Sequence, residues 1–256
     1  MLGLGLFETI LALDGEPVFC ERHLARLRGS CARLGWHLEL PDLREIIREL
    51  LQRNDLTLGR SKIRLAVSGG SGPLHDLALG ADHGVWMSAS PAAAGSPAPM
   101  TTTANLSPWV RNERSPLAGM KCASYAENVV ALHHAARLGF AETVFLNTAG
   151  HLCEAATANL FLVKNGGLFT PSLESGCLPG ITRAVVIELA LPLAIPCVQR
   201  QLSLQDLHAA DELFFTSSIR GLMGVSRFET RTFPCGPVTQ ALREAWNAET
   251  RRKIHS

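Results

Sequence analysis

The first seventy residues contain two stretches whose apolar positions predict strands. Residues 6–20, LFETILALDGEPVFC, are apolar on both sides of Asp14-Gly15, and an Asp-Gly pair between apolar runs is a hairpin signal. Residues 61–70, SKIRLAVSGG, predict a third strand that ends in a glycine turn. We therefore expect three strands here, two of them joined by a tight turn.

Between these strands, apolar residues recur at the spacing of a helix. Residues 23–36 carry apolar side chains on one helical face, and Gly35 is suited to end that helix. A second helix is predicted over residues 41–56, with Pro41 in its first turn. The two apolar faces comprise Leu24, Leu27, Cys31 and Leu34 in the first helix, and Leu43, Ile46, Ile47, Leu50 and Leu51 in the second.

The second half of the chain has longer apolar runs. Residues 143–163, TVFLNTAGHLCEAATANLFLV, predict a strand, a turn at residues 148–150, and a buried strand that ends in NLFLV. Residues 184–190, AVVIELA, predict an apolar helix, and residues 210–218, ADELFFTSS, predict a strand that ends in hydroxyl side chains. Strands and helices thus follow one another without strict alternation, which predicts the α+β class.

Two domains are expected from the change in pattern along the chain. Residues 88–100, SASPAAAGSPAPM, predict a loop or an edge connection, and residues 109–117, WVRNERSPL, show no periodicity. We predict a small N-terminal α/β domain over residues 1–108, an interdomain loop over 109–117, and a larger C-terminal domain over 118–256.

Composition narrows the function classes. In a chain of 256 residues, 46% are hydrophobic and 18% are charged, as in a packed globular protein. The net charge of +1 gives no electrostatic argument for binding nucleic acid or an anionic membrane. No apolar run reaches the roughly 18 residues of a membrane helix, and the N-terminus lacks the basic start of a secretion signal. Seven cysteines without a CxxC pair predict reduced thiols in a cytoplasm, and the adjacent pair His133-His134 predicts no metal site.

Lys121 is the first candidate for chemistry. It follows the small and apolar residues of SPLAGM, and such surroundings permit the burial that a nucleophilic lysine needs to stay neutral. Four residues later comes Tyr125, the only tyrosine of the chain, and Asn128 follows. Taken alone, each of these residues is more often found on an ordinary helix surface.

Two further segments carry candidate groups. Glu154 lies among alanines at a strand, and a carboxylate in apolar surroundings needs a polar partner. Gly180-Ile181-Thr182 precedes an apolar helix, whose free N-terminal N–H groups suit a phosphate, although ordinary helix caps use the same residue types. Arg26, in the segment HLARL, has a guanidinium that could bind a phosphate with two hydrogen bonds, or could simply be solvated.

These segments together resemble one known family. GLFETI at 5–10, H-x-x-R-L at 23–27, K-x-x-x-Y-x-x-N at 121–128, EAATANLF at 154–161 and LPGITR at 178–183 resemble the class IV (fold type IV) pyridoxal-phosphate enzymes. That family includes branched-chain aminotransferases, D-amino-acid aminotransferases and 4-amino-4-deoxychorismate lyases. The resemblance covers most of the chain, from about Gly5 to about Val238.

The resemblance implies a cofactor, pyridoxal 5′-phosphate (PLP), and a role for each motif. Lys121 would bond to the cofactor aldehyde and carry protons, and Glu154 would bind the protonated ring nitrogen. Tyr125 would bind the ring oxygen, and Leu178 would pack on one face of the ring. The phosphate would lie against Arg26, Ile181, Thr182, Ser217 and Ser218.

The finer resemblance favours one reaction. The segments NLFLVKNGGLFTPSLESGCLPGITR and GLFETI look most like bacterial 4-amino-4-deoxychorismate lyases, which form 4-aminobenzoate and pyruvate in folate synthesis. These lyases often have an arginine in V-S-R-G-x-G, where this chain has VSGGSG at residues 67–72. The substrate site would then use Thr9 together with one or more of Arg64, Arg111 and Arg220.

Other functions remain open at this point. An aminotransferase acting on D- or branched-chain amino acids would use the same Lys121; Arg64 stands where branched-chain enzymes have a Y-x-R pair, but Lys62 replaces the tyrosine. A third hypothesis is a non-catalytic binding protein that kept the fold. The presence of Lys121 disfavours it, because such a protein would not need the lysine. The family resemblance also implies a homodimer with a small-molecule amine as substrate.

Overall fold

The computed structural model describes residues 4–72, 76–77, 80, 82–92 and 101–254. The chain forms two compact units. The first comprises Met1–Pro97, Met120–Ser124 and Glu249–Ser256, and the second comprises Ala98–Gly119 and Tyr125–Ala248. Lys121 therefore belongs to the first unit, although the C-terminal domain expected from the sequence, residues 118–256, included it.

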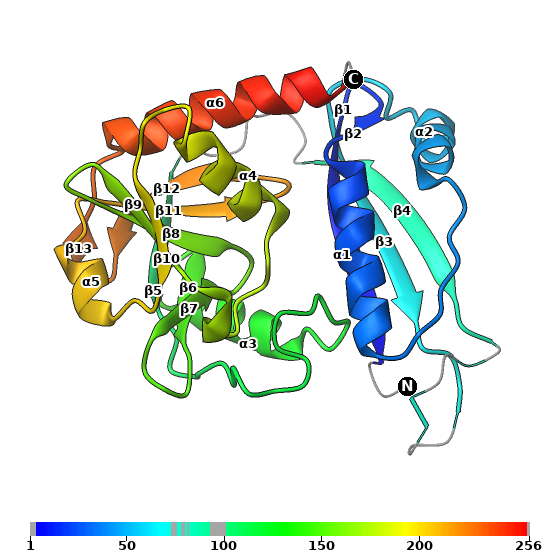
Figure 1. Ribbon diagram of the computed structural model, residues 1–256, viewed down its shortest axis with the longest axis horizontal. Coiled ribbons are helices and arrows are strands. Elements are labelled where there is room, and N and C mark those ends of the chain that lie inside the picture. Colours follow the sequence, from blue (N-terminus) through cyan, green and yellow to red (C-terminus); the bar gives the residue numbers. More distant parts are fainter. Residues whose placement is uncertain (1–3, 73–75, 78–79, 81, 93–100, 255–256) are drawn as a thin grey trace. The chain divides into compact units, whose positions relative to one another are not determined.

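The first unit is built on a four-stranded antiparallel sheet with strand order β2-β1-β3-β4 (Figure 1). The predicted hairpin is confirmed: Asp14 and Gly15 have φ angles of 48° and 83°, as a two-residue turn with two positive φ angles requires. The strands are β1 (Gly5–Leu13), β2 (Glu16–Pro17), β3 (Arg60–Ser68) and β4 (Val85–Pro91).

Two helices cover one face of this sheet. Helices α1 (Cys20–Arg33) and α2 (Leu43–Arg53) confirm the two predicted amphipathic segments. The second helix begins later than expected, because the Asp42 side chain caps it by accepting from Arg44 N–H, which leaves Pro41 outside. One apolar core joins the two helices to the sheet and includes Leu6, Ile10, Leu24, Leu27, Trp36, Ile47, Leu51, Ile63 and Leu65.

The second unit is built on a nine-stranded mixed sheet that curls on itself (Figure 1). Eight strands follow the order β10-β9-β8-β11-β12-β5-β6-β7, and β13 pairs with β12. Its strands are β5 (Thr101–Leu106), β6 (Glu142–Leu146), β7 (Leu152–Ala155), β8 (Asn159–Lys164), β9 (Gly167–Pro171), β10 (Cys197–Arg200), β11 (Glu212–Ser217), β12 (Gly221–Phe228) and β13 (Arg231–Thr232).

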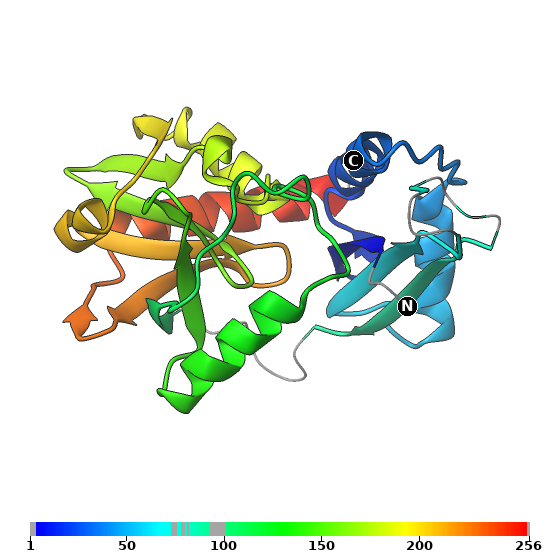
Figure 2. The same ribbon diagram turned by 90° about the horizontal axis from the view of Figure 1, so that it is seen from below.

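Helices flank this second sheet. In Figure 2, α3 (Ala126–Arg137) is the green helix, and it packs against β6. Helix α4 (Ile181–Ala190) packs against β11 and confirms the predicted apolar helix. The remaining helices are the short η1 (Leu173–Ser175), α5 (Leu204–Ala209) and α6 (Pro237–Ile254), which the sequence pattern did not predict.

The compact units change over at Pro97–Ala98, earlier than the predicted interdomain segment 109–117. The reason is β5, which pairs with β12 and β6 and so belongs to the second sheet. Residues 88–91 of the predicted loop are part of β4, and residues 93–100 lie outside the described residues.

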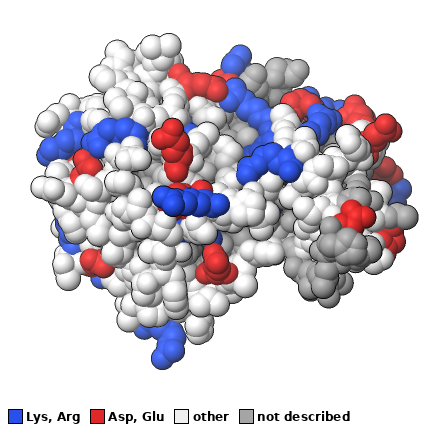
Figure 3. All heavy atoms as spheres, turned by 60° about the horizontal axis from the view of Figure 1, so that its bottom comes forward, with Lys and Arg blue, Asp and Glu red and all other residues white. Residues whose placement is uncertain are grey.

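The distribution of surface charge and the state of the cysteines agree with the near-neutral net charge and the unpaired thiols expected from the sequence. Acidic and basic side chains are interspersed on the face that Figure 3 shows. All seven cysteines are free thiols. Among the helices of the described residues, none is long and apolar enough to cross a membrane.

Candidate functional site

Lys121 is held against β1 in the first unit. Its carbonyl oxygen accepts a hydrogen bond from Phe7 N–H at 2.9 Å, and its Nζ lies 4.3 Å from the centre of the Phe7 ring. The guanidinium of Arg64 lies 3.9 Å from the centre of the same ring. Arg64 pairs with Thr9 across strands β1 and β3. The structure thus brings the Lys121 amine and the Arg64 guanidinium to the same aromatic ring, and Thr9 lies opposite Arg64 in the sheet.

Arg26 belongs to a buried polar cluster that the sequence did not predict. Its Nε and Nη2 donate to the two carboxylate oxygens of Glu8 at 2.9 and 2.6 Å. His23 Nδ1 contacts Glu8 Oε2 at 2.7 Å. Glu8 and His23 are each only 1% exposed. The helix face of α1 therefore presents Arg26 in a fixed orientation, because a bidentate pair restrains a guanidinium more strongly than a single hydrogen bond.

The charges of this cluster depend on one another. Burial alone would raise the pKa of Glu8, but hydrogen bonds from His23 and Arg26 and the Arg26 charge hold that pKa below its ordinary value. Burial lowers the pKa of His23, and the hydrogen bond to Glu8 opposes that shift only in part. Glu8 is thus an anion paired with Arg26, and His23 is a neutral partner.

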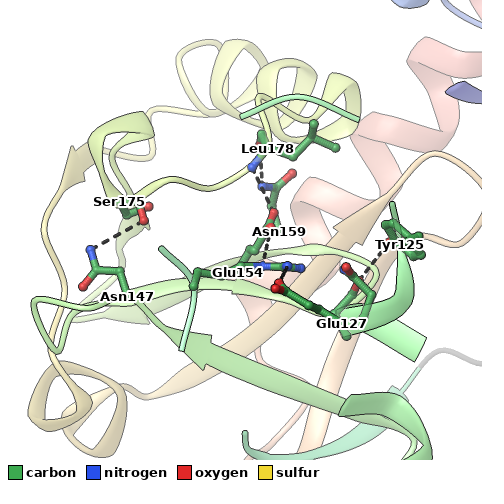
Figure 4. A network of polar contacts seen from close by, with 10 residues as sticks. Tyr125, Glu127, Asn147, Glu154, Asn159, Ser175 and Leu178 are labelled. Atoms are coloured by element: carbon green, nitrogen blue, oxygen red, sulfur yellow. Dashed lines mark hydrogen bonds and ion pairs between the residues drawn. The ribbon is translucent and has the colours of Figure 1, made fainter. Parts of the chain in front are cut away.

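In the second unit, Glu154 on β7 is the centre of a polar network (Figure 4). Its Oε2 accepts from Leu178 N–H at 2.9 Å, and its Oε1 lies 3.5 Å from Nε of Arg111. The Glu154 side chain is 14% exposed and that of Arg111 17%. The predicted need of Glu154 for a polar partner is therefore met by a backbone N–H group and a cation.

A side chain on strand β8 holds the loop that carries Leu178. Asn159 Nδ2 donates to Leu178 carbonyl oxygen at 2.7 Å, so both polar backbone groups of Leu178 are bonded (Figure 4). Nearby in the same network, the Tyr125 hydroxyl donates to Ala156 carbonyl oxygen at 2.9 Å, and Asn128 Nδ2 donates to the same oxygen at 2.6 Å. A phenol has one proton but can also accept, so Tyr125 keeps acceptor capacity in this arrangement.

The N-terminus of α4 forms an anion-binding candidate. Gly180 is its N-cap, with no side-chain cap, and Ile181 and Thr182 supply the first turn. Such N–H groups, with the helix dipole, favour an anion. Helix α4 packs against β11, where Thr216 has a buried hydroxyl that lacks a hydrogen-bond partner among the described residues. A buried hydroxyl without a partner calls for an additional polar group.

Ser217 and Ser218 lie at the end of β11 and in the turn that follows. Ser217 Oγ accepts from Arg220 N–H at 3.4 Å. The Arg220 side chain is engaged elsewhere: Nη2 contacts Glu142 Oε2 at 3.2 Å and also bonds to Thr157. Because Glu142 is fully buried, Arg220 places its positive charge against a carboxylate inside the second unit.

A substitution at Gly180 tests the anion-binding turn. A Cβ atom at this position would lie 1.9 Å from Asn159 Oδ1. We expect Gly180→Ala to displace Asn159 and the first turn of α4, to cost about 1–3 kcal/mol of stability, and to weaken the binding of a phosphate-bearing ligand. Gly139→Ala is not a fair control because of its positive φ; Gly29→Ala, on α1 with open space around it, is suitable. Equal ligand affinity in the two variants would contradict the proposed turn.

Several of these residues were not singled out from the sequence. Glu8 had a usable signal, because a carboxylate that alternates with apolar residues on one face of a strand needs a polar partner. His23 and Arg26 lie three positions apart on one helix face, so both can reach the same group. Asn159 was read only as part of a motif. Thr157 and Glu142 gave no local signal, since their partner Arg220 is distant in the sequence.

Comparison with known proteins agrees with this geometry. The model of the family amino-transferase class IV matches residues 5–228. A relative from Synechocystis sp., provisionally named a branched-chain-amino-acid aminotransferase, is 32% identical over 244 residues, which cover 91% of this chain and 77% of the relative.

Solved structures are also similar. A structure from Legionella pneumophila, provisionally named a 4-amino-4-deoxychorismate lyase, has a TM-score of 0.90 and 30% identity, and the match covers 97% of this chain and 92% of that one. The branched-chain amino acid aminotransferase of Escherichia coli has a TM-score of 0.87 and 28% identity, covering 97% and 86%.

Proposed function

Because this chain belongs to the class IV aminotransferases, which have fold type IV and depend on PLP, we propose that it converts 4-amino-4-deoxychorismate to 4-aminobenzoate and pyruvate. The observation that carries this proposal is a pair of cations on one face of β3. Lys62 and Arg64 are both exposed, two residues apart, and therefore point the same way. This substrate bears two carboxylates, whereas a branched-chain amino acid bears one carboxylate and an apolar side chain.

The second unit has residues that fit the cofactor. Glu154 offers a mostly buried carboxylate for a ring nitrogen, with one oxygen already oriented by Leu178 N–H. Ile181 and Thr182 offer the first turn of α4 for a phosphate. The buried hydroxyl of Thr216, which has no hydrogen-bond partner among the residues that the structure describes, calls for one more polar group. We propose that Ser217, Ser218 and Tyr125 complete this set, and that Leu178 packs on the ring.

In the first unit, Lys121 and Arg26 are the residues assigned to the cofactor. Glu8 orients Arg26 with two hydrogen bonds, and the planar, permanently charged guanidinium is a group suited to binding a phosphate. The Lys121 amine would bond to the cofactor aldehyde. When bound, PLP supplies a conjugated cationic ring that can accept an electron pair released by the substrate.

Lys121 would carry the protons of the reaction. Once the substrate amine has replaced Lys121 on the cofactor aldehyde, the freed lysine amine would remove the proton from the substrate ring carbon that bears the amino group. It would then give a proton to the departing enolpyruvyl group, which leaves as pyruvate. One lysine acts first as base and then as acid. The ring that remains is aromatic, and this gain in stability drives the release of 4-aminobenzoate.

The alternative is an aminotransferase that acts on D- or branched-chain amino acids with a 2-oxo acid as acceptor. The name carried by the Synechocystis relative supports it. The same Lys121 would move a proton between the substrate carbon and the cofactor, and Arg64 alone would bind the substrate carboxylate. A homodimer, in which the family resemblance places the active sites near the subunit interface, is proposed for either reaction.

A paired assay of the PLP-loaded protein separates the two reactions. One sample receives 4-amino-4-deoxychorismate and is read for 4-aminobenzoate and pyruvate. The other receives D- and L-amino acids with 2-oxoglutarate or pyruvate and is read for amino transfer. Product in the first sample alone supports the lyase, whereas transfer in the second sample alone rejects it in favour of the aminotransferase.

Arg64 is the predicted carboxylate anchor. We expect Arg64→Ala to raise KM about 10- to 100-fold, because a hydrogen bond to a charged group contributes about 1.5–3 kcal/mol, while the visible absorbance of the bound cofactor stays unchanged. Arg53→Ala is the matched control, since Arg53 is exposed on α2 and pairs with Glu49 on the same helix. An unchanged KM in Arg64→Ala would remove Arg64 from the substrate site.

A further inference from the structure

Arg111 is the charged side chain that lies against Glu154. The backbone of Arg111 lies alongside the end of strand β6. Its N–H donates to Leu146 carbonyl oxygen at 2.8 Å, and an isolated parallel β-bridge pairs it with Asn147. Its guanidinium lies 4.4 Å from the centre of the Phe145 ring, with Nε facing Glu154 and Nη1 donating to Glu127 at 3.0 Å. These contacts fix the guanidinium on three sides.

The Nε group of Arg111 is the least satisfied part of this arrangement. It is buried and has no hydrogen-bond partner within the described part of the chain, yet Glu154 Oε1 lies 3.5 Å away. A buried N–H group without a bond is costly, so a short movement that closes this distance is favourable. Arg111 is thus directed at Glu154 rather than at solvent.

We propose that Arg111 is a positioning residue that keeps Glu154 anionic and oriented toward the ring nitrogen of the cofactor. This inference rests on the assignment of Glu154 to that nitrogen. A carboxylate has about four acceptor positions on its two oxygens. Leu178 N–H binds Oε2 and Arg111 faces Oε1, so both oxygens are held in a fixed orientation.

Electrostatics gives the direction of the effect. The proton between a pyridine nitrogen and a carboxyl can reside on either group. The guanidinium is always charged, and it lies next to the carboxylate in a region from which water is largely excluded, where charge interactions are strong. A ring nitrogen bonded to Glu154 would be farther from Arg111 than the carboxylate is, so the attraction of Arg111 to the anion would outweigh its repulsion of the ring. Arg111 therefore favours the proton on the ring nitrogen.

This role differs from substrate binding, for which Arg111 was a candidate on the sequence alone. Its side chain is 17% exposed, and its charged atoms face Glu127 and Glu154. The outer partner Glu127 is 78% exposed, and exposed pairs contribute little. The pair with Glu154 is the one with a chemical consequence.

Nitrogen-15 NMR of the protein loaded with ring-labelled PLP tests this role, because the signals of protonated and neutral pyridine nitrogens are well separated. We expect a signal near the protonated position in the parent protein. Arg111→Met should move the signal toward the neutral position and lower kcat about tenfold, the effect of one pKa unit on a proton equilibrium. Arg111→Lys, which keeps the charge, should restore more than half of the shift, and Glu127→Gln should leave the signal in place.

The outcomes separate this inference from its premise. If Glu154→Gln leaves the nitrogen signal unchanged, Glu154 does not bind the ring nitrogen. The assignment of Glu154 and the positioning role of Arg111 are then both rejected. If Glu154→Gln moves the signal and Arg111→Met does not, the role of Arg111 alone is overturned. Should Arg111→Met take up no cofactor, Arg111→Lys and Arg111→Gln decide: a displaced signal only in the glutamine variant supports the role, and equal signals overturn it. None of these readings depends on whether the reaction is a lyase or a transferase reaction.

Discussion

Lys121→Ala is expected to abolish the visible absorbance of the PLP-loaded protein and to lower turnover at least about 10³-fold. The absorbance would require the covalent bond proposed between the Lys121 amine and the cofactor. In the proposed reaction, turnover requires the same amine as base and acid, and general acid–base catalysis contributes about 10²–10⁴-fold. Removing both functions with one substitution should give the largest loss of activity of any change in the chain.

Lys164→Ala is the control for this substitution. Lys164 is 44% exposed and pairs with Asp211 on the surface of the second unit, so its removal should change neither the absorbance nor the turnover. Visible spectra of both variants after loading, with equal bound phosphate, make the comparison. If Lys121→Ala retained the parent absorbance band, another lysine would hold the cofactor and the proposed proton transfers would have no base.

The elements that sequence reasoning predicted well are those with local signals. The Asp14-Gly15 hairpin and helices α1 and α4 follow from turn chemistry and from periodicity, which depend on neighbouring residues alone. Strand β5 and helix α6 were missed. The burial pattern of β5 is set by β12 and β6, and those partners lie far along the chain.

The candidate site shows the same division. The positions of Lys121, Glu154 and the α4 N-terminus follow from motifs whose residues are close in the sequence. The partners of those residues do not: Arg111 reaches Glu154 over 43 positions of chain, and Arg220 reaches Glu142 over 78. Such pairs are created by folding. From the sequence alone, four arginines are candidates for binding a phosphate or a substrate carboxylate. Their contacts in the folded protein distinguish their roles, which the residue type alone does not.

Those contacts assign different tasks to residues of one type. Arg26 is oriented for its proposed phosphate contact by a fully buried carboxylate, and Arg220 is paired with another buried carboxylate in the second unit. Arg64 lies over an aromatic ring beside Lys121. Arg111 faces Glu154. Of these four, Arg64 is the one whose described contacts include no carboxylate partner, which supports its assignment to the substrate.

Glu8→Ala should be the most destabilising single substitution in the first unit. It removes a carboxylate that is 1% exposed and leaves Arg26 and His23 without it. Removing one partner of a buried ion pair costs about 3–5 kcal/mol, because the remaining charge is then buried and uncompensated. We expect a loss of this size in the free energy of unfolding, measured by denaturant titration, with weakened cofactor binding because Arg26 loses its orientation.

Glu16→Ala is the matched control, and pH supplies a second test. Glu16 lies in the same hairpin and also binds an arginine, Arg48, with two hydrogen bonds, but its side chain is 30% exposed, so its removal should cost less than about 1 kcal/mol.

The pKa of Glu8 is lowered in the fold, so the unfolded chain binds the proton first as pH falls. The stability from Glu8 is therefore present above the unfolded pKa of about 4.3 and is lost as pH falls through the folded value. Glu8→Ala should flatten this acid limb, and an unchanged limb would show that Glu8 is not the anion of the cluster.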